Sequence, residues 1–203
     1  IQDTGGDIMT IEKGSRDLVH LIQQASMTER VEMTAADLVV GSECGGSDAT
    51  SGLASNPLTG LAGDLLIEAG GAYMHEEVSE LMGCADVLAG RAVNDEVATD
   101  IREAIEASER ACFEHGRFAW GYGNIEGGLT SIEEKSYGCL AKSGSKPLEG
   151  VLATYGSLAG RKGYFISLSE PNSGTFSGDP EGINQFAAHG AHLAMFTTGC
   201  GST

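Results

Sequence analysis

Helix-forming and strand-forming segments alternate along this chain of 203 residues, and the alternation limits the folds open to it. Apolar residues recur at helical spacing over 15–30, and a short β-favouring run at 38–40 then ends in Gly41. The pattern continues with helices expected over 56–70, 94–116, 130–143 and from 179 onward, and with strands expected over 72–74, 164–168 and 192–196. Helices of crossover length between strands favour parallel strand pairing.

We therefore expect an α/β fold with a mainly parallel, Rossmann-like sheet and crossover helices, forming a single domain over 1–203. In such sheets, ligands bind beyond the carboxyl ends of the strands. Unusual polar segments follow four of the expected strands, at 42–48, 75–80, 169–172 and 197–203. We expect these segments to form active-site loops at one edge of the sheet.

Two of the expected helices begin with an asparagine. Asn56 and Pro57 have the form of an N-cap followed by proline at the first helical position, and Asn94 has the form of a cap for the longest helix. A buried apolar stripe is expected on the first of these helices, formed by Leu58, Leu61, Leu65 and Leu66. Gly70 and Gly116 are the expected stops.

The formal net charge is −17, from 29 acidic and 12 basic residues. This charge repels nucleic acid phosphates and anionic membrane surfaces, so we expect neither as a partner, and an anionic substrate would need a local cation. The five cysteines are odd in number and form no C-x-x-C pair, which argues against a disulfide framework and a zinc ribbon. A cytoplasmic location fits this composition best.

Residues 41–48 read GSECGGSD and form the most informative segment. The paired glycines Gly45 and Gly46 let the backbone approach a ligand, while Cys44, Ser47 and Asp48 place a thiol, a hydroxyl and a carboxylate beside it. The spacing fits neither a dinucleotide fingerprint nor a P-loop. A plain tight turn is the alternative.

His75, Glu76, Glu77 and Glu80 form a second polar cluster. Their imidazole and carboxylates can bind a divalent cation or move a proton. The spacing is not diagnostic, because acidic side chains also occur at solvated helix starts, where they complement the helix dipole.

A third segment, GGLTSIEEKS at 127–136, leads from a Gly-Gly turn into a helix. Backbone N–H groups at the helix start and the Lys135 ammonium group both favour an anion, and Glu134 and Ser136 flank that lysine. An exposed, charged first turn is the alternative. Lys142, near the end of the same expected helix, is expected to complement the dipole and to matter little for turnover.

The last strand is flanked by polar residues. His192 is its first residue, and a glycine-rich loop at 197–203, which includes Thr198 and Gly199, can close over a substrate. A lone histidine in this place is more often a structural side chain than a ligand.

Four blocks follow one another between 41 and 203, reading GSECGGSDATSGLASNP, EEVSELMGCAD, GNIEGGLTSIEEKSYGCLAKSGSKPL and AHLAMFTTGCGS. Together they resemble the altronate and galactarate dehydratase family, which also includes the large subunit of sulfolactate sulfo-lyase. Family members are longer, so the resemblance implies a catalytic-core domain from a longer family chain. The chain departs from the pattern at 119–122 and at Cys200, where the family usually has arginine, a fork suited to a carboxylate.

The resemblance implies a lyase that eliminates water from an aldarate or aldonate to give a 2-keto-3-deoxy acid, with a divalent metal, typically iron(II). Such an elimination needs a base for the α-proton, a cation for the developing negative charge and an acid for the departing hydroxide. The residues expected to act are Cys44, Asp48, Glu77 and Glu80 as metal ligands, with His192 as a further candidate ligand; Glu134, Lys135, Ser136 and His192 in catalysis; and Gly45, Gly46, Ser47, Asn124, Gly127, Gly128, Thr198 and Gly199 in substrate binding.

The resemblance also sets the expected partners and the rival functions. The expected partners are a small sugar acid and an N-terminal domain or small subunit, and a homo-oligomer is compatible with the sequence. One rival function is a sulfo-lyase that releases sulfite from sulfolactate. The other is a non-catalytic subunit that binds a sugar acid or supports assembly.

Overall fold

The computed structural model describes residues 1–116, 120, 122–168, 179–199 and 201. The chain divides into two compact units, 1–33 and 34–203. Helix α1 (Asp7–Ser26) makes up most of the first unit, and its apolar side chains, among them Leu18 and Ile22, are exposed. It begins and ends earlier than the helix expected over 15–30. None of the helices described is long and apolar enough to span a membrane.

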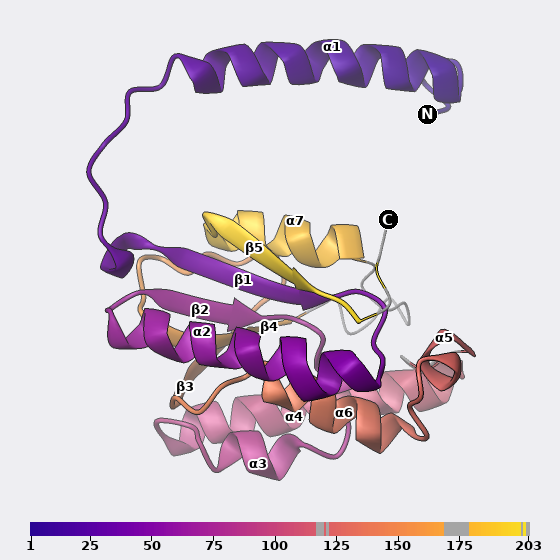
Figure 1. Cartoon of the computed structure of the whole chain (residues 1–203), viewed down its shortest axis with the longest axis vertical. Coiled ribbons are helices and arrows are strands. Elements are labelled where there is room, and N and C mark those ends of the chain that lie inside the picture. The colour runs from indigo at the N-terminus through magenta and orange to yellow at the C-terminus, as the bar shows by residue number, and fades with distance from the viewer. Residues whose placement is uncertain (117–119, 121, 169–178, 200, 202–203) are drawn as a thin grey trace. The chain divides into compact units, whose positions relative to one another are not determined.

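Five parallel strands form the centre of the second unit, in the order β3-β4-β2-β1-β5 (Figure 1). Their bounds are Val39–Cys44 for β1, Ala72–His75 for β2, Leu148–Leu152 for β3, Gly163–Ser167 for β4 and Leu193–Thr197 for β5. Every pairing is parallel, which confirms the predicted α/β fold. Strand β3 was not expected, since Glu149 and Gly150 interrupt its apolar run.

Helices cover both faces of this sheet. On one side lie α2 (Asn56–Glu68), α3 (Ala85–Ala89), α4 (Asp95–His115) and α6 (Ile132–Ala141), and on the other lies α7 (Asp179–His189) (Figure 1). The core is correspondingly split: Tyr73 and Tyr164 are buried on the four-helix side, and Phe165 and Phe186 on the α7 side. The remaining short elements are η1 (Ala35–Asp37), η2 (Ser51–Ser55), η3 (Val78–Glu80) and α5 (Tyr122–Glu126).

The predicted cap at Asn56 and the predicted leucine stripe on α2 are both wrong. A π-helical turn precedes Asn56, which is itself helical and donates from its side chain to the Gly138 carbonyl. The buried face of α2 carries small residues, including Gly60 and Gly63. The expected core leucines are instead largely exposed at three positions, Leu58, Leu61 and Leu65. A helix with glycines on its inner face can approach its neighbours more closely than leucines would permit.

The other boundaries agree with the sequence. The Asn94 side chain accepts a hydrogen bond from Val97 N at 2.9 Å, and Gly116 closes α4 in the left-handed region at φ 62°. Gly70 likewise follows α2 with φ 90°.

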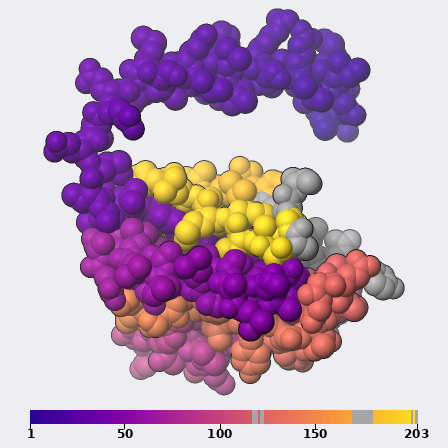
Figure 2. All heavy atoms as spheres, in the orientation of Figure 1, coloured from indigo at the N-terminus to yellow at the C-terminus, as the bar shows by residue number. Residues whose placement is uncertain are grey.

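The polar segments of the sequence follow the carboxyl ends of β1, β2 and β5. Cys44 ends β1, His75 ends β2, and Thr197 ends β5. The expected loop at 169–172 and residues 200, 202 and 203 lie outside the described residues. Strand β5 is an edge strand of the sheet, and its segment, in yellow, lies at the surface in Figure 2. Leu193, its first residue, is 58% exposed.

Candidate metal centre and its lysines

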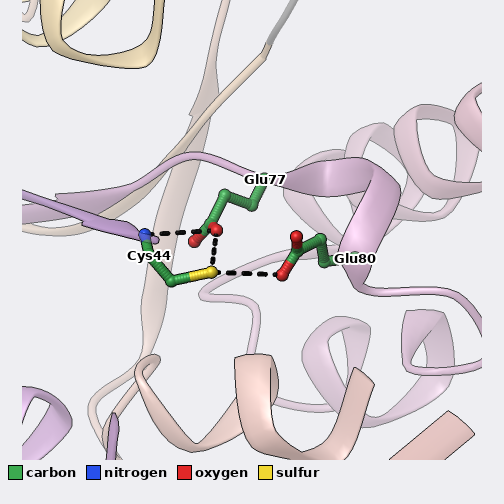
Figure 3. Close-up of side chains that lie close together, drawn as sticks. All are labelled: Cys44, Glu77 and Glu80. Carbon is green, nitrogen blue, oxygen red and sulfur yellow. Dashed lines mark hydrogen bonds between the residues drawn. The ribbon is translucent and has the colours of Figure 1, made fainter. Parts of the chain in front are cut away.

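Cys44, Glu77 and Glu80 converge where β1 and β2 end (Figure 3). Because these strands are neighbours, the last residue of β1 meets the segment that follows β2. The Cys44 Sγ atom lies 2.5 Å from Glu77 Oε1 and 3.3 Å from Glu80 Oε2. The Cys44 N–H also donates to Glu77 Oε1 at 3.2 Å. The thiol and both carboxylates therefore face one point.

The backbone at Glu77 adopts a conformation that is rare for a residue with a side chain. Its φ of 83° and ψ of 40° lie in the left-handed region. This turn lies between β2 and η3, and the Glu77 side chain lies against Cys44 with only 5% of the residue exposed. Such unfavourable backbone is often found at functional sites.

Two lysines of the α6 segment complete the cluster. Lys135 Nζ lies 2.8 Å from Glu80 Oε1, and Lys142 forms an ion pair with Glu77 Oε2. Residues seven apart lie on the same face of a helix, so both ammonium groups reach the carboxylates from one side. The expectation that Lys142 only complements the helix dipole is wrong, because its side chain is fully buried against Glu77.

Each carboxylate divides its two oxygens between a lysine and the thiol. Glu77 turns Oε2 to Lys142 and Oε1 to Cys44, and Glu80 turns Oε1 to Lys135 and Oε2 to Cys44. The two negative charges are thus balanced by two positive charges. This pairing makes burial of the carboxylates tolerable, since an unpaired buried charge is strongly unfavourable.

The pKa of the Cys44 thiol is raised to about 12. Burial is the largest cause and Glu80 adds to it, while Lys142, a hydrogen bond with Ser47 and Lys135 oppose the rise. The thiol is therefore protonated at neutral pH and donates to the carboxylates. A cation that binds sulfur here has to displace that proton.

The donor set fits a divalent transition metal. One ligand atom each from Cys44, Glu77 and Glu80 lies within 4.8 Å of the others. Ligands bound to one ion at about 2.0–2.3 Å can have this spacing, and three protein ligands leave a position for substrate or water. A sulfur donor beside carboxylates favours an ion of the iron or zinc kind over magnesium or calcium.

Asp48, the fourth expected ligand, does not join this group. Its Oδ1 accepts hydrogen bonds from Ser51 N at 2.8 Å and from the Thr50 hydroxyl at 2.7 Å. The Thr50 hydroxyl bond, as the largest cause, lowers the pKa of the Asp48 carboxyl. Asp48 thus begins the helical turn that follows it.

The expected glycine loops meet around Asp48. Gly199 N donates to the Gly46 carbonyl at 3.2 Å, and Ala49 N donates to the Gly127 carbonyl at 3.0 Å. A Cβ atom at Gly127 would lie 2.6 Å from Asp48 Cβ, and one at Gly199 would lie 1.8 Å from its Oδ1. Only glycine permits this approach.

The remaining expected substrate-binding residues lie in or against the same three loops. Gly45 N donates to Thr197 O, and the Asn124 amide donates to Ser47 O. Gly128 has φ 91°, and the Thr198 hydroxyl accepts from Gly201 N.

The other expected catalytic residues are not brought to the carboxylates. Glu134 accepts hydrogen bonds from Thr130 at the exposed start of α6, and the Ser136 hydroxyl donates within the helix to Ile132 O. His192 precedes β5, at the amino ends of the strands, whereas Cys44 lies at their carboxyl ends, and the Nδ1 atom of His192 accepts from Val39 N. His75 is buried with Nδ1 2.9 Å from the Tyr164 hydroxyl, and burial holds its pKa well below the usual range.

Sequence comparison shows the family to which the chain belongs. The model of D-galactarate/altronate dehydratase, C-terminal, matches residues 35–203. The chain is 34% identical to altronate dehydratase of Bacillus subtilis (strain 168) over 195 residues, which are 95% of this chain and 38% of that protein. It is 35% identical to galactarate dehydratase (L-threo-forming) of Escherichia coli (strain K12) over 190 residues, 89% of this chain and 34% of that protein.

A third relative has a different named activity. The (2R)-sulfolactate sulfo-lyase subunit beta of Chromohalobacter salexigens is 33% identical over 206 residues, covering 98% of this chain and 51% of that subunit. The chain thus spans between a third and a half of the length of these curated relatives. It belongs to the D-galactarate/altronate dehydratase family, in the part that the family model describes as C-terminal.

Proposed function

We propose that this chain carries the metal-dependent site of a hydro-lyase that removes water from an aldarate or aldonate. The observation that carries the proposal is the buried Cys44, Glu77 and Glu80 cluster with Lys135 beside it. Two relatives are named as dehydratases of sugar acids, which agrees with such a site.

The reaction breaks two bonds of a 2,3-dihydroxy acid. The α-carbon loses its hydrogen as a proton, the β-carbon loses its hydroxyl, and a double bond forms between the two carbons. The departing hydroxide takes a proton and leaves as water, and the resulting enol becomes the 2-keto-3-deoxy acid. A site for this reaction must therefore accept one proton, deliver another and tolerate negative charge next to the substrate carboxylate.

Cys44, Glu77 and Glu80 would hold the divalent ion, which we propose to be iron(II). When bound, the ion would stabilise the negative charge that develops on the substrate when the α-proton leaves. The protein contributes the ligand geometry: both carboxylates are already turned toward the thiol by their lysines. A cation would take the place of the thiol proton between these groups, and the sulfur and Glu77 Oε1, now 2.5 Å apart, would separate to bind it.

Lys135 is the group we propose to move a proton or to anchor the substrate carboxylate. Its Nζ lies within hydrogen-bond reach of Glu80 Oε1, so an ammonium group and a carboxylate that can exchange a proton stand side by side. Lys135 is the fourth residue of α6, after the Ser131 cap. The positive end of the helix dipole favours an anion there.

The glycine loops around Asp48 are the proposed substrate-binding surface. They come from the ends of β1 and β5 and from the turn before α6, and they are fixed to one another by backbone hydrogen bonds. The missing side chains at Gly127 and Gly199 make room for Asp48, around which the three loops join. We propose that these loops orient the sugar chain and limit the access of water.

Sulfo-lyase chemistry is the second candidate. Of the three relatives reported above, the sulfo-lyase subunit beta is the one of which this chain covers the largest share, 51%. The same α-proton removal would then be followed by loss of sulfite from carbon rather than hydroxide. Both reactions use the same groups until the leaving group departs.

The proposal extends to partners and location. Because the relatives are two to three times longer than the matched region, we propose that this part is a catalytic-core domain completed by an N-terminal domain, a small subunit or a second copy. We place it in the cytoplasm. The five cysteines of the sequence are odd in number and form no C-x-x-C pair, which suits a reducing compartment.

The test is a product assay on metal-free protein reloaded with iron(II). Altronate, galactarate and sulfolactate are supplied separately, and 2-keto acid and sulfite are measured. We expect a chelator to abolish turnover and iron(II) to restore it. Release of 2-keto acid without sulfite supports the hydro-lyase, and release of sulfite supports the second candidate. Binding of an acid without turnover by any loaded form would indicate a non-catalytic subunit, and full activity without metal would overturn the metal mechanism.

A further inference from the structure

Lys142 is a buried cation that the reaction outlined above does not use. It stands at the end of α6, and no part of its surface is exposed. A lysine normally keeps its ammonium group in water, and one that is buried needs a charged partner. The partner here is Glu77 Oε2.

The main chain around Lys142 is held by the sheet and by the turn that follows α3. The Tyr73 hydroxyl, from β2, donates to the Lys142 carbonyl at 2.8 Å and lies 2.7 Å from the Ser42 hydroxyl of β1. The guanidinium of Arg91 donates to Ser143 Oγ at 2.6 Å and to the carbonyls of Ser143 and Lys146. The starting point of the Lys142 side chain is therefore fixed relative to Cys44 and Glu77, which follow the same two strands.

The ion pair determines which oxygen of Glu77 faces the thiol. With Oε2 on the ammonium group, Oε1 is left to accept from the Cys44 N–H and the Cys44 thiol. The proposed ligand oxygen and the oxygen bound to Lys142 belong to one carboxylate, so they cannot rotate independently. Loss of the ammonium group would free the carboxylate to rotate and leave a buried charge without its partner.

We propose that Lys142 is a positioning residue for the metal centre: it holds the Glu77 carboxylate in the orientation that binds a divalent cation together with Cys44. This inference rests on the proposed function only in taking the cluster as a cation site. Groups that orient metal ligands through a hydrogen bond typically change metal affinity by 10–100-fold when they are removed. Lys142 acts in this way through Glu77 and does not itself contact the cation or the substrate.

The test is a titration of the metal-free protein with Co²⁺, followed by the thiolate-to-cobalt charge-transfer absorption. This absorption reports bond formation at Cys44 directly and does not depend on turnover. Lys142→Met removes the charge and nearly preserves the volume. The matched control is Lys146→Met, which removes an equal charge from the exposed pair with Glu68 in the turn that follows.

We expect Lys142→Met to weaken Co²⁺ binding about 10–100-fold and Lys146→Met to leave it unchanged. A double-mutant cycle then tests whether Lys142 acts on metal binding through Glu77. In a Glu77→Gln background, where the oriented carboxylate is gone, Lys142→Met should cause no further loss, because the lysine has nothing left to orient. This comparison also covers the case in which Lys142→Met alone fails to fold, since the double variant contains no unpaired charge at this position.

Three results would overturn the inference. Equal or tighter Co²⁺ binding by Lys142→Met would show that the ammonium group does not support the cation site. A further loss in the Glu77→Gln background would show that Lys142 acts by another route. Absence of a Co²⁺ charge-transfer signal in the unaltered protein would overturn both this inference and the metal centre of the proposed function, whereas the first two results leave the proposed function standing.

Discussion

Cys44 is the residue on which the metal proposal depends most directly. It supplies the one sulfur in the described cluster of three donors, and a hydroxyl in its place is a poorer ligand for a transition metal. We expect Cys44→Ser to reduce metal binding and turnover strongly while leaving the fold nearly intact, since serine is close to cysteine in size. Metal content after dialysis, kcat and the thermal unfolding midpoint are the measurements.

The pH dependence of metal binding gives a control for this prediction. Because the Cys44 pKa is about 12, the thiol must lose its proton whenever a metal binds at neutral pH, so apparent affinity should rise about tenfold per pH unit between pH 6 and 8. In Cys44→Ser, metal binding should no longer release this proton, so the rise of apparent affinity with pH should be lost. Unchanged kcat and metal content in the serine variant would return Cys44 to a purely structural role.

Lys135 and Lys146 provide a matched pair for the acid–base proposal. Lys135 is nearly buried against Glu80, whereas Lys146 forms a more exposed pair with Glu68. We expect Lys135→Ala to lower kcat by about 10²-fold or more, the scale of general acid–base groups, and Lys146→Ala to change it little. Kinetics at fixed ionic strength, with folding checked by circular dichroism, decide the matter. Equal and small effects would remove Lys135 from the proposed mechanism.

The sequence predicted the carboxylates of the site better than its cations. Cys44, Glu77 and Glu80 follow neighbouring expected strands, so their proximity follows from parallel pairing. Spacing alone shows that Lys142 shares a helix face with Lys135, but it does not show that this face is buried. The place of His192 could have been predicted from the sequence. A residue at the start of a parallel strand lies at the amino ends of the strands, away from the polar loops at their carboxyl ends.

Helix α2 shows how an element can be predicted in extent and misjudged in orientation. Its leucines have helical spacing and predict a buried stripe, yet Gly60 and Gly63 face the neighbouring elements. The hydrophobic pattern predicts a helix, but it does not show whether the leucines or the glycines of that helix face the core. Strand β1 illustrates the same point, since Gly41 continues the strand beneath the Phe186 ring and does not end it.

The contact between α2 and the end of α6 can be tested at Gly60. A Cβ atom there would lie 2.4 Å from the Ala141 carbonyl oxygen and 2.8 Å from Gly144 N, which are backbone atoms on both sides of Lys142. We expect Gly60→Ala to lower the free energy of unfolding by about 1–3 kcal/mol, the usual range for overpacking. Because the backbone next to Lys142 must move, we also expect weaker Co²⁺ binding.

Gly123→Ala is the control for that substitution. A Cβ atom at Gly123 meets nothing within 4 Å, so the free energy of unfolding should change by less than about 0.5 kcal/mol. Urea unfolding of the three proteins gives the comparison. If Gly60→Ala were as stable as the unaltered protein, the close approach of α2 to the end of α6 would be wrong.

The net charge of the whole molecule repels an anionic substrate, whereas the site would attract one once a divalent ion is bound. A chain with a net charge of −17 repels an anionic acid at long range. In the site, two lysines form ion pairs with two glutamates, so the charges of these four side chains sum to zero before a cation binds. A bound divalent ion would leave the cluster positive even after the thiol loses its proton, and an anionic substrate would then be favoured.

Stability of the whole fold should depend on pH through His189, which joins three segments of the second unit. Its Nε2 lies 2.8 Å from the Ser167 hydroxyl at the end of β4, and its Nδ1 contacts the Gly156 carbonyl oxygen. Burial is the largest influence and lowers the pKa of this histidine, the Gly156 contact opposes it, and Arg161 lowers the pKa further. The neutral ring, with its proton on Nδ1, satisfies both contacts.

The sign of the pH effect follows from this lowered pKa. Above the ordinary histidine value of about 6.5, the ring is neutral in the folded and unfolded chain, and its full contribution to stability is present. As the pH falls below that value, the unfolded chain takes up a proton at His189 that the folded chain resists, and the contribution of His189 to stability decreases by at most about 1.4 kcal/mol per pH unit. Urea unfolding between pH 7.5 and 5.5 should therefore show a decline that His189→Gln reduces, whereas a matched change at the exposed His115 should leave the decline in place. A decline of equal steepness in all three proteins would mean that His189 is not the group that titrates.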